Sequence, residues 1–341
     1  MQITGVNQYH LEHVLEEPFY PTWIPGYPQS THELELFEVE TDEGITGYGA
    51  SPSFAGGLEY ETPLELFLTG EDPHNVDGIL GKLETVDLVG PRPWHVETAL
   101  WDIIGKDAGK PVYELFGAEA GDIPVYASTG ELMDADDRIE YIEARLDEGF
   151  EAVKLRVTEV DHIDVVRGVR EAFPDLTLMI DANKGWAVRV MEEPVEWSFA
   201  DALAFARGLE DVGGVAWLEE PLHRHDYEGY ARLRDAVDVN IAGGEFNNGV
   251  IRQAVDVARM GQANGLQFVP HTWTNAVGFA ANLHVMTAVG SPWCEYPMEP
   301  PWTPDVWSFV LENDFEHDDG TIRAPDAPGL GIEIRDELLA E

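Results

Sequence analysis

The sequence is poor in cysteine and in lysine. It has one cysteine, Cys294, among 341 residues, which excludes a disulfide framework and a metal site built from cysteines. There are only five lysines, and 20 basic residues stand against 65 acidic ones, for a net charge of -45. A chain this acidic repels nucleic acid and anionic membranes, so we expect neither as a partner.

Long hydrophobic runs are also missing. No apolar run approaches the length that spans a membrane. The first residues, Met1–Val6, have neither the basic region nor the apolar core of a signal peptide. We therefore expect a cytoplasmic protein.

Enough apolar residues are present for a large core, since hydrophobic types make up 44% of the chain. The acidic residues are spread along the sequence and do not form a tail. This distribution favours a protein from a salt-loving organism, where concentrated salt screens the self-repulsion of the chain. An ordinary acidic enzyme is the alternative.

Acidic residues recur at the ends of short apolar runs in the second part of the chain. Asp181, Glu219 and Glu245 each close such a run, and one strand, one helix and two loops fit between successive members. Residues that recur at successive strand ends are typical of the C-terminal rim of a parallel (β/α) barrel. We predict an α/β fold with a (β/α) barrel and an α+β capping domain.

The predicted boundaries divide the chain into three segments. Residues 1–121 form the capping domain, residues 122–300 form the barrel, and residues 301–341 return to the capping domain. Within the barrel, we expect seven strands. The first three begin at Ile123, Ala152 and Asp175, the next three end at Glu219, Glu245 and His271, and the last reaches Tyr296. We expect helices over 136–149, 161–173, 198–212, 227–236, 249–265 and 276–289.

An aromatic loop interrupts the capping domain at residues 18–27, before the half-buried strand predicted at 34–40. It is either a local core of its own or a lid that keeps water out of a pocket at the barrel rim, and we favour the lid. Under this interpretation Tyr20 and Trp23 contact the substrate.

The barrel is one strand short. Only seven strands fit between Ile123 and Glu295, and the step from Glu245 to His271 holds a single helix. Compared with the usual length of a βα unit, about 25 residues are missing near residues 247–249. These residues would form a helix and the sixth strand. Either residues are absent from the printed sequence, which we favour because an open barrel leaves two buried edges unpaired, or the deletion is real.

Lys154 and Arg156 lie two positions apart on one predicted strand, so both face the barrel interior. Three carboxylates at neighbouring strand ends suit a hard cation such as Mg²⁺. Lys154 is then either a plain charge partner or a general base whose pKa is lowered by burial and by the dication. His271, at another strand end, is either a hydrogen-bonded core residue or a second base on the opposite face of a substrate.

The sequence resembles the enolase superfamily, in its mandelate racemase subgroup. The residues that carry this resemblance are Lys154-Leu155-Arg156, Asp181-Ala182-Asn183, Glu219-Glu220-Pro221, Gly244-Glu245 and Pro270-His271. The resemblance implies the (β/α)7β form of the barrel, a Mg²⁺ cofactor, a small-molecule carboxylate as substrate, and assembly into dimers or octamers.

The resemblance also implies roles for individual residues. Asp181, Glu219 and Glu245 would bind Mg²⁺, and Lys154 and His271 would be the two bases. Glu295 would hydrogen-bond the substrate carboxylate, and Asn183 would line the site.

Two departures from the subgroup bear on the reaction. Mandelate racemase has a second lysine where this chain has Arg156, which cannot act as a base at ordinary pH and instead lowers the pKa of Lys154. The Lys-x-Arg form is common in sugar-acid dehydratases, so we expect dehydration of a hydroxy or sugar acid, with racemisation or epimerisation as the alternative. The other departure is the sixth strand, whose Asp orients the histidine in this subgroup; its true loss would favour a non-catalytic binding protein.

Overall fold

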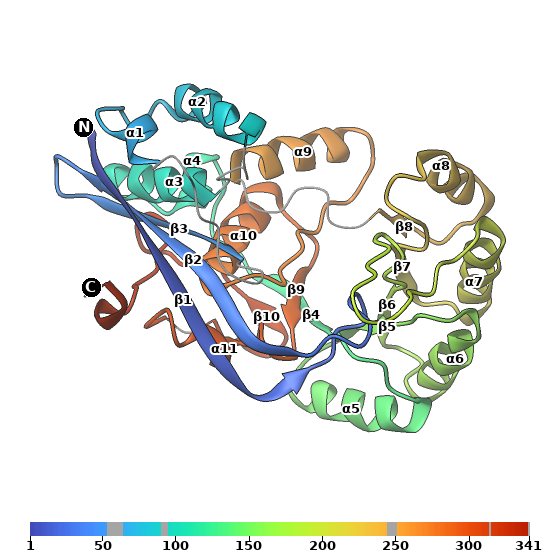
Figure 1. Ribbon diagram of the computed structural model, residues 1–341. Helices are drawn as coiled ribbons and strands as arrows, with labels where there is room; N and C mark the ends of the chain where they lie inside the picture. The colour runs from blue at the N-terminus through green and yellow to red at the C-terminus, as the bar shows by residue number, and fades with distance from the viewer. Residues whose placement is uncertain (53–63, 90–94, 244–250, 314, 340–341) are drawn as a thin grey trace.

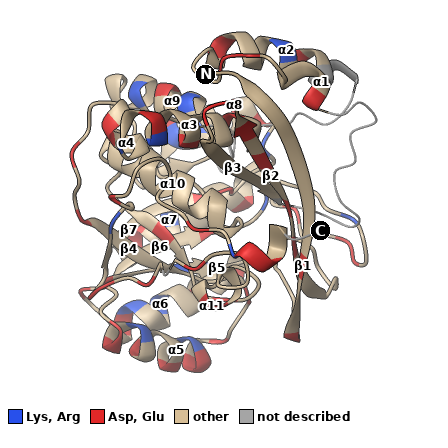
Figure 2. Ribbon diagram, turned by 90° about the vertical axis from the view of Figure 1, so that its left-hand side faces the viewer, with Lys and Arg blue, Asp and Glu red and all other residues tan. Residues whose placement is uncertain are grey.

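The structure is a computed structural model that describes residues 1–52, 64–89, 95–243, 251–313 and 315–339 (Figure 1). An antiparallel sheet with short helices lies at the N-terminal side, and a parallel sheet flanked by helices forms the rest, as predicted for a capping domain and a barrel. Acidic residues are spread over both parts (Figure 2). No helix within the described ranges is long and apolar enough to cross a membrane.

The capping domain is built on a three-stranded antiparallel sheet. Its helices α1 (Glu65–Leu68), α2 (Val76–Val89), α3 (His95–Ala108) and α4 (Val112–Leu115) accompany strands β1 (Ile3–Phe19), β2 (Gln29–Thr41) and β3 (Thr46–Pro52). Gly47 and Gly49 allow α3 to lie directly on β3, because a Cβ at either position would come within 2.2 Å or less of a helix carbonyl oxygen. The apolar face of β2 packs on α3 through Phe37, Val39 and Leu100.

The barrel strands belong to one seven-stranded sheet in the order β10-β4-β5-β6-β7-β8, with β9 paired to β4. All pair in parallel except β10, which runs antiparallel to β4. The strands are β4 (Ile123–Ser128), β5 (Ala152–Arg156), β6 (Thr177–Asp181), β7 (Val215–Glu219), β8 (Ile241–Ala242), β9 (Cys294–Pro297) and β10 (Thr321–Ile322).

Helices follow the strands and cover the outside of the sheet (Figure 1). They are α5 (Ala135–Asp147), α6 (Ile163–Ala172), α7 (Phe199–Val212), α8 (Tyr227–Ala236), α9 (Ile251–Ala263), α10 (Ala276–Val289) and α11 (Pro304–Trp307), with 3₁₀ turns η1 (Val160–His162) and η2 (Asp336–Leu339). The helix predicted over 198–212 is confirmed as α7, and Ser198 caps it: its side chain accepts from the amide of Asp201, and the Asp201 carboxylate accepts in return from Ser198.

The predicted strand that ends at His271 is wrong: residues 266–271 are assigned to no strand. A strand needs a neighbour for its backbone ladder, and the described neighbour on this side, β8, is only two residues long. Side chains hold the segment in place: the Ser291 hydroxyl donates to the Phe268 carbonyl oxygen at 3.1 Å, and the Asn282 amide donates to the His271 carbonyl oxygen at 2.8 Å. The predicted gap at residues 247–249 and the predicted ligand Glu245 lie outside the described residues.

The C-terminal segment contacts both parts of the molecule. Strand β10 extends the barrel sheet beside β4. Further on, the Leu330 amide donates to the buried Asp102 carboxylate of α3 at 2.8 Å, and Gly329 bridges to Pro111. The segment therefore links the first barrel strand to the capping domain.

Candidate active site

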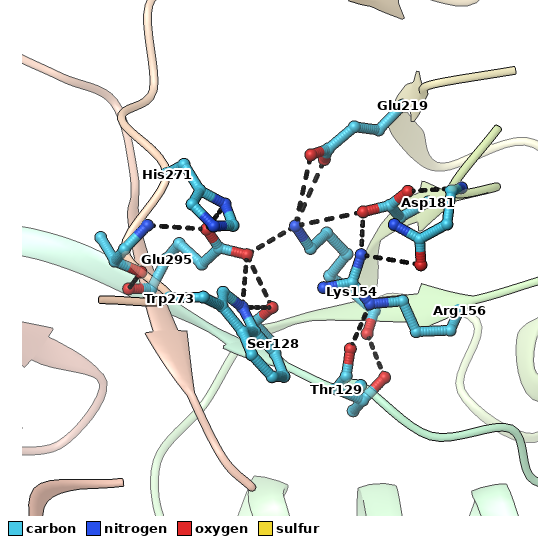
Figure 3. Close-up of polar contacts among 12 residues, drawn as sticks. Ser128, Thr129, Lys154, Arg156, Asp181, Glu219, His271, Trp273 and Glu295 are labelled. Atoms are coloured by element: carbon cyan, nitrogen blue, oxygen red, sulfur yellow. Dashed lines mark hydrogen bonds and ion pairs between the residues drawn. The ribbon is translucent and has the colours of Figure 1, made fainter. Parts of the chain in front are cut away.

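Lys154 lies at the centre of a buried cluster of carboxylates inside the barrel (Figure 3). Its Nζ atom is 2.5 Å from Oε1 of Glu295, 3.3 Å from Oε2 of Glu219 and 3.6 Å from Oδ2 of Asp181. Strand β5 carries Lys154 into this position, and every residue of that strand is buried. The fixed backbone ladder of β4, β5 and β6 therefore positions the ammonium group.

The carboxylates around Lys154 decide its protonation state. Burial by itself lowers the pKa of Lys154, but the negative charges of Glu219, Glu295 and Asp181 outweigh burial and raise the pKa above its usual value. This direction is opposite to the lowered pKa of the general-base interpretation, and it is the direction expected for the alternative, a charge partner. Arg156 acts in the expected sense, since its positive charge lowers the pKa of Lys154.

Arg156 lies beside Lys154 on the same face of β5 and holds the next strand end. Its guanidinium donates to Asp181 and, at 3.3 Å, to the side-chain oxygen of Asn183. Its Nε atom donates to the carbonyl oxygen of Thr129 at 2.5 Å. All five donors of a guanidinium are fixed in one plane, so these contacts orient Asp181 and Asn183 together.

Asp181 and Glu219 end neighbouring strands and are register partners between β6 and β7. Asn183, the second residue after Asp181, and Glu220, directly after Glu219, adopt the left-handed conformation, with φ of 48° and 47°. Side chains other than glycine rarely adopt this conformation, and it is concentrated at functional sites. Asp181 and Glu219 lie side by side because their strands pair in register at this end of the sheet.

The described residues supply part of a metal site. No group of three His, Cys, Asp or Glu side chains that could hold a metal exists among the residues that the structure describes. Two of the three predicted ligands, Asp181 and Glu219, are adjacent, buried and rich in the oxygen donors that Mg²⁺ prefers. The third, Glu245, is outside the described ranges. The donor set that is present therefore fits Mg²⁺ but is incomplete without a further ligand.

His271 reaches the same cluster from the other side, through Glu295 (Figure 3). The Nδ1 atom of His271 is 3.3 Å from Oε2 of Glu295, while Oε1 of Glu295 faces Lys154. Burial alone would raise the pKa of Glu295, but Lys154 and His271 hold it well below its usual range. Lys154 and His271 thus flank one ionised carboxylate.

The aromatic loop reaches the site through Thr22 and Trp23. The Thr22 hydroxyl donates to the side-chain oxygen of Asn183 at 2.7 Å. The Trp23 ring lies 5.3 Å from Trp273 and 5.7 Å from Trp302, and the Arg156 guanidinium lies over Trp23 at 5.6 Å. These contacts place the loop against residues of the barrel; whether it acts as a lid stays a prediction. The second predicted residue of the loop, Tyr20, is 55% exposed.

Several polar side chains of the site are not identified by the sequence analysis. The indole of Trp217 donates to Glu219 at 3.0 Å, and the indole of Trp273 donates to Glu295 at 3.0 Å. The Ser128 hydroxyl donates to Glu295 at 2.7 Å. Trp217 lies two positions before Glu219 on β7, so the two-residue period of a strand could have identified it. For Ser128 and Trp273, no comparable local signal exists.

Comparisons with known proteins agree with this geometry. The family model "Mandelate racemase / muconate lactonizing enzyme, N-terminal domain" matches residues 17–117, and "Enolase C-terminal domain-like" matches residues 137–250 and 246–338. D-galactarolactone cycloisomerase of Agrobacterium fabrum is 31% identical, with 100% of this chain and 98% of the relative covered. Arabinonate dehydratase of Saccharolobus solfataricus is 28% identical, with 93% and 92% covered.

A solved structure supports the fold. D-glucarate dehydratase from Agrobacterium tumefaciens, complexed with magnesium, superposes with a TM-score of 0.81 at 24% identity, covering 99% of this chain and 98% of the other. The relatives carry segments that this chain lacks, since the match to the cycloisomerase runs over 394 aligned positions against 341 residues here. The two C-terminal family matches meet at residues 246–250, where the sequence analysis places the missing unit. With both domains matched, this enzyme belongs to the enolase superfamily, in its mandelate racemase subgroup.

Proposed function

We propose that the chain removes the proton α to the carboxylate of a hydroxy or sugar acid and then eliminates water. The observation that carries this proposal is the convergence of Lys154 and His271 on opposite sides of Glu295, next to Asp181 and Glu219. A basic group on each side of a substrate can take a proton from one face and deliver a proton to the other. Dehydration uses this pair to remove the α-proton and to protonate the leaving hydroxide.

Asp181 and Glu219, with Glu245 as the third ligand, would hold Mg²⁺ in this proposal. Mg²⁺ bound by these carboxylates would supply positive charge that stabilises the substrate carboxylate as negative charge develops on it, and would offset the field that now favours the ammonium form of Lys154. Trp217 and Arg156 hydrogen-bond the two described ligands and would orient them.

The substrate would lie between the strand ends and the lid. Arg156 presents a fixed positive charge under Trp23 and Trp273, and Asn183 offers its amide at the same place. We assign Arg156 and Asn183 to the substrate's oxygen atoms, and Trp23 to the exclusion of water. Tyr20 would contact only a substrate or product that extends beyond the lid, because it is exposed.

Arg156 favours dehydration over racemisation. A racemase that works through a second lysine at this position has a further titratable group, whereas a guanidinium stays charged and binds oxygen. Two relatives reported above, an arabinonate dehydratase and a galactarolactone cycloisomerase, act on sugar-acid derivatives and support the same substrate class. Racemisation or epimerisation is the second candidate, because two opposed bases also suffice for it.

Proton exchange in D₂O tests the proposal and separates the candidates. The purified protein is incubated with Mg²⁺ in concentrated KCl, which screens its charge, with a panel of arabinonate, galactonate, glucarate and galactarate. Dehydration predicts a 2-oxo acid product together with loss of the α-proton signal. Exchange or epimerisation without a 2-oxo acid would establish the second candidate, and no exchange with any acid would contradict both.

Magnesium binding is tested without any substrate. Because the Trp217 indole donates to Glu219, Mg²⁺ at Glu219 should change the fluorescence of Trp217. Titration calorimetry of the wild type should give one site per chain, and Glu219→Gln should remove it. Glu299→Gln, which replaces a buried carboxyl group that accepts from the Gly130 amide, is the control and should keep the site. Equal binding by both variants would contradict the assignment.

A further inference from the structure

Glu299 is a buried carboxyl group that the proposed mechanism does not use. It lies two residues past the end of β9, at the edge of the sheet where β4 also ends. The residue is only 9% exposed. Its Oε2 atom accepts from the backbone amide of Gly130 at 2.6 Å. Its Oε1 atom is sealed from solvent and has no hydrogen-bond partner among the described residues.

The aromatic loop, residues 18–27, covers this carboxyl group. Gly130 has no side chain, and three groups fill the space beside its Cα. A Cβ atom there would lie 2.6 Å from the Phe19 ring, 2.7 Å from the Trp273 ring and 2.9 Å from Oε2 of Glu299. The Trp302 ring packs edge-on against Phe19, and the Trp302 amide donates to the Glu299 carbonyl oxygen at 3.2 Å. Water therefore reaches Oε1 only when these rings separate.

The backbone of the aromatic loop is joined to the same place. The Thr22 amide donates to the Gly130 carbonyl oxygen at 3.3 Å, and the Tyr20 amide donates to the Glu131 carboxylate at 3.4 Å. Both distances exceed the usual range for an N–H···O hydrogen bond, so both bonds are weak. A change of charge at Glu299 can therefore shift the balance between contact and release of the loop.

The charged groups around Glu299 do not neutralise it by contact, since it forms no ion pair with a described residue. Burial raises the pKa of Glu299 to about 7, and the charge of Glu131 acts in the same direction. The Gly130 amide, Arg138 of α5 and Arg156 of β5 lower this pKa, but burial outweighs them. Both guanidinium groups stay charged at every pH considered below.

We propose that the aromatic loop closes over the protonated form of Glu299 and opens when this carboxyl group ionises. In the closed loop, a carboxylate would leave a negative charge at Oε1 with neither donor nor water. The neutral acid also lacks a partner at Oε1, but an unpartnered neutral group costs far less than a buried charge. Opening of the loop lets water solvate the ionised form. An effect on substrate retention rests on the proposed function; the coupling between Glu299 and the loop does not.

The raised pKa of Glu299 fixes the direction of the pH dependence. In the open loop, Glu299 should titrate near the ordinary value for a glutamate, about 4.3. In the closed loop it titrates at about 7. Closure is therefore strongest below the lower value and weakens as the pH rises toward the higher one, with up to a tenfold larger opening constant for each pH unit. These two values predict a rise of about 40-fold from pH 5 to pH 7 and a plateau above that range.

Hydrogen exchange in the full-length protein without substrate tests the proposal. Mass spectrometry at pH 5, 6, 7 and 8 in concentrated KCl, corrected for the intrinsic exchange rate, gives the opening constant of the segment 18–27. Residues 177–181 of β6 are the reference, because a ladder pairs them on both sides. We expect the opening constant of the wild-type loop to rise by about 40-fold from pH 5 to pH 7 relative to this reference. A constant value over this range would overturn the proposal.

Two variants assign the pH dependence to one carboxyl group. Glu299→Gln keeps the size and an acceptor oxygen for the Gly130 amide but cannot ionise, so its loop should open equally at pH 5 and pH 7. Glu131→Gln is the matched control: it replaces the other carboxyl group that contacts the loop and should keep the wild-type dependence. The wild-type dependence in Glu299→Gln, or its loss in Glu131→Gln, would refute the coupling. If Glu299→Gln does not fold, the wild-type and Glu131→Gln profiles still decide.

Kinetics separate this inference from the proposed function. If the wild type converts an acid, its KM should rise from pH 5 to pH 7 relative to the KM of Glu299→Gln, because an open loop retains substrate less well. If it converts no acid, the proposed function fails, and the exchange measurement on the loop still stands or falls by itself.

Discussion

The two basic residues of the site are held in contrasting ways. Lys154 lies on β5, which is paired on both sides by β4 and β6, so a continuous ladder fixes its backbone. His271 follows a segment that belongs to no strand, beside the two-residue strand β8, and side-chain hydrogen bonds hold its backbone. We call these regions the ladder side, β4 to β7, and the coil side, β8 and residues 266–271.

The contrast shows that one side of the candidate site is fixed by sheet topology and the other by individual side chains. A strand in a parallel sheet keeps its position even when one side chain is changed, because many backbone hydrogen bonds to its neighbours hold it. The coil side depends on a few groups, notably Asn282, Thr272 and Glu295. Single substitutions should therefore disturb the coil side locally and the ladder side only where a buried charge is removed.

The largest effect is expected for Lys154→Met on the ladder side. Removal of the ammonium leaves Glu219 and Glu295 buried without their ion-pair partner, while Asp181 keeps its contact with Arg156. We expect α-proton exchange to fall by about 10³-fold and the free energy of unfolding to fall by about 3–5 kcal/mol. Exchange in D₂O and denaturant unfolding in concentrated KCl measure the two effects.

Lys110→Met is the matched control for that change. It removes the same charge from a side chain that is 53% exposed and lies 3.5 Å from Glu114. An exposed pair contributes about 0–1 kcal/mol, so both measurements should stay near wild type. Equal losses in the two variants would mean that net charge, and not the buried cluster, governs the result.

Amide hydrogen exchange compares the two sides directly. The free energy of opening should be about 4 kcal/mol greater for the amides of β6, which bond within the ladder, than for the amides of residues 266–271. The amides of β6 should therefore exchange more slowly, on the order of 10³-fold. Peptides that cover residues 177–181 and 266–271 report this difference by mass spectrometry. Equal protection would mean that residues 266–271 pair as a strand in solution, and the contrast would disappear.

The ladder side could be predicted from the sequence. Its strands are short apolar runs closed by Asp181 and Glu219, and the helix predicted over 198–212 between them is α7. Local pattern is sufficient there because each strand meets a neighbour of similar length. The two-residue period also places Lys154 and Arg156 on one face, which the structure confirms.

The coil side could not be predicted from local pattern. Leu266 to Val269 has the composition of a strand, but a strand forms only where a neighbouring strand offers backbone partners. The described neighbour, β8, ends at Ala242. The contact between His271 and Glu295 joins residues from separate parts of the chain, and no periodicity relates them. The raised pKa of Lys154 likewise depends on three carboxylates from three other strands.

A smaller effect is expected for His271→Gln on the coil side. Loss of one general base lowers exchange by about 100-fold, and only at the face of the substrate that His271 serves. The unfolding free energy should change little, because the side chain is 16% exposed and its backbone is held independently by Asn282. Stereospecifically deuterated substrates separate the faces. The exposed His223→Gln is the control, and a similar loss at both faces would contradict two separate bases.

Trp217→Phe should weaken metal binding by about 10-fold, because groups that hydrogen-bond a metal ligand set its orientation. The substitution removes the indole that donates to Glu219 and keeps most of the apolar volume beside Tyr126. Titration calorimetry with Mg²⁺ measures the affinity. Trp293→Phe, a change of the same kind in a residue at the edge of the same apolar cluster, should bind Mg²⁺ as the wild type does. If both variants weaken binding equally, packing and not the hydrogen bond is responsible.

The smallest effect is expected where the aromatic loop, residues 18–27, contacts both sides. Thr22 hydrogen-bonds Asn183, just past the end of β6, whereas Trp23 packs on Trp273, two residues after His271. Thr22→Val keeps the shape and removes a hydrogen bond that contributes about 1 kcal/mol, so KM should rise about fivefold with kcat unchanged. Thr31→Val, on β2, removes a hydroxyl that bonds Glu33 instead and should leave KM unchanged. If kcat falls while KM stays constant, Thr22 acts on the chemical step, and the lid does more than retain the substrate.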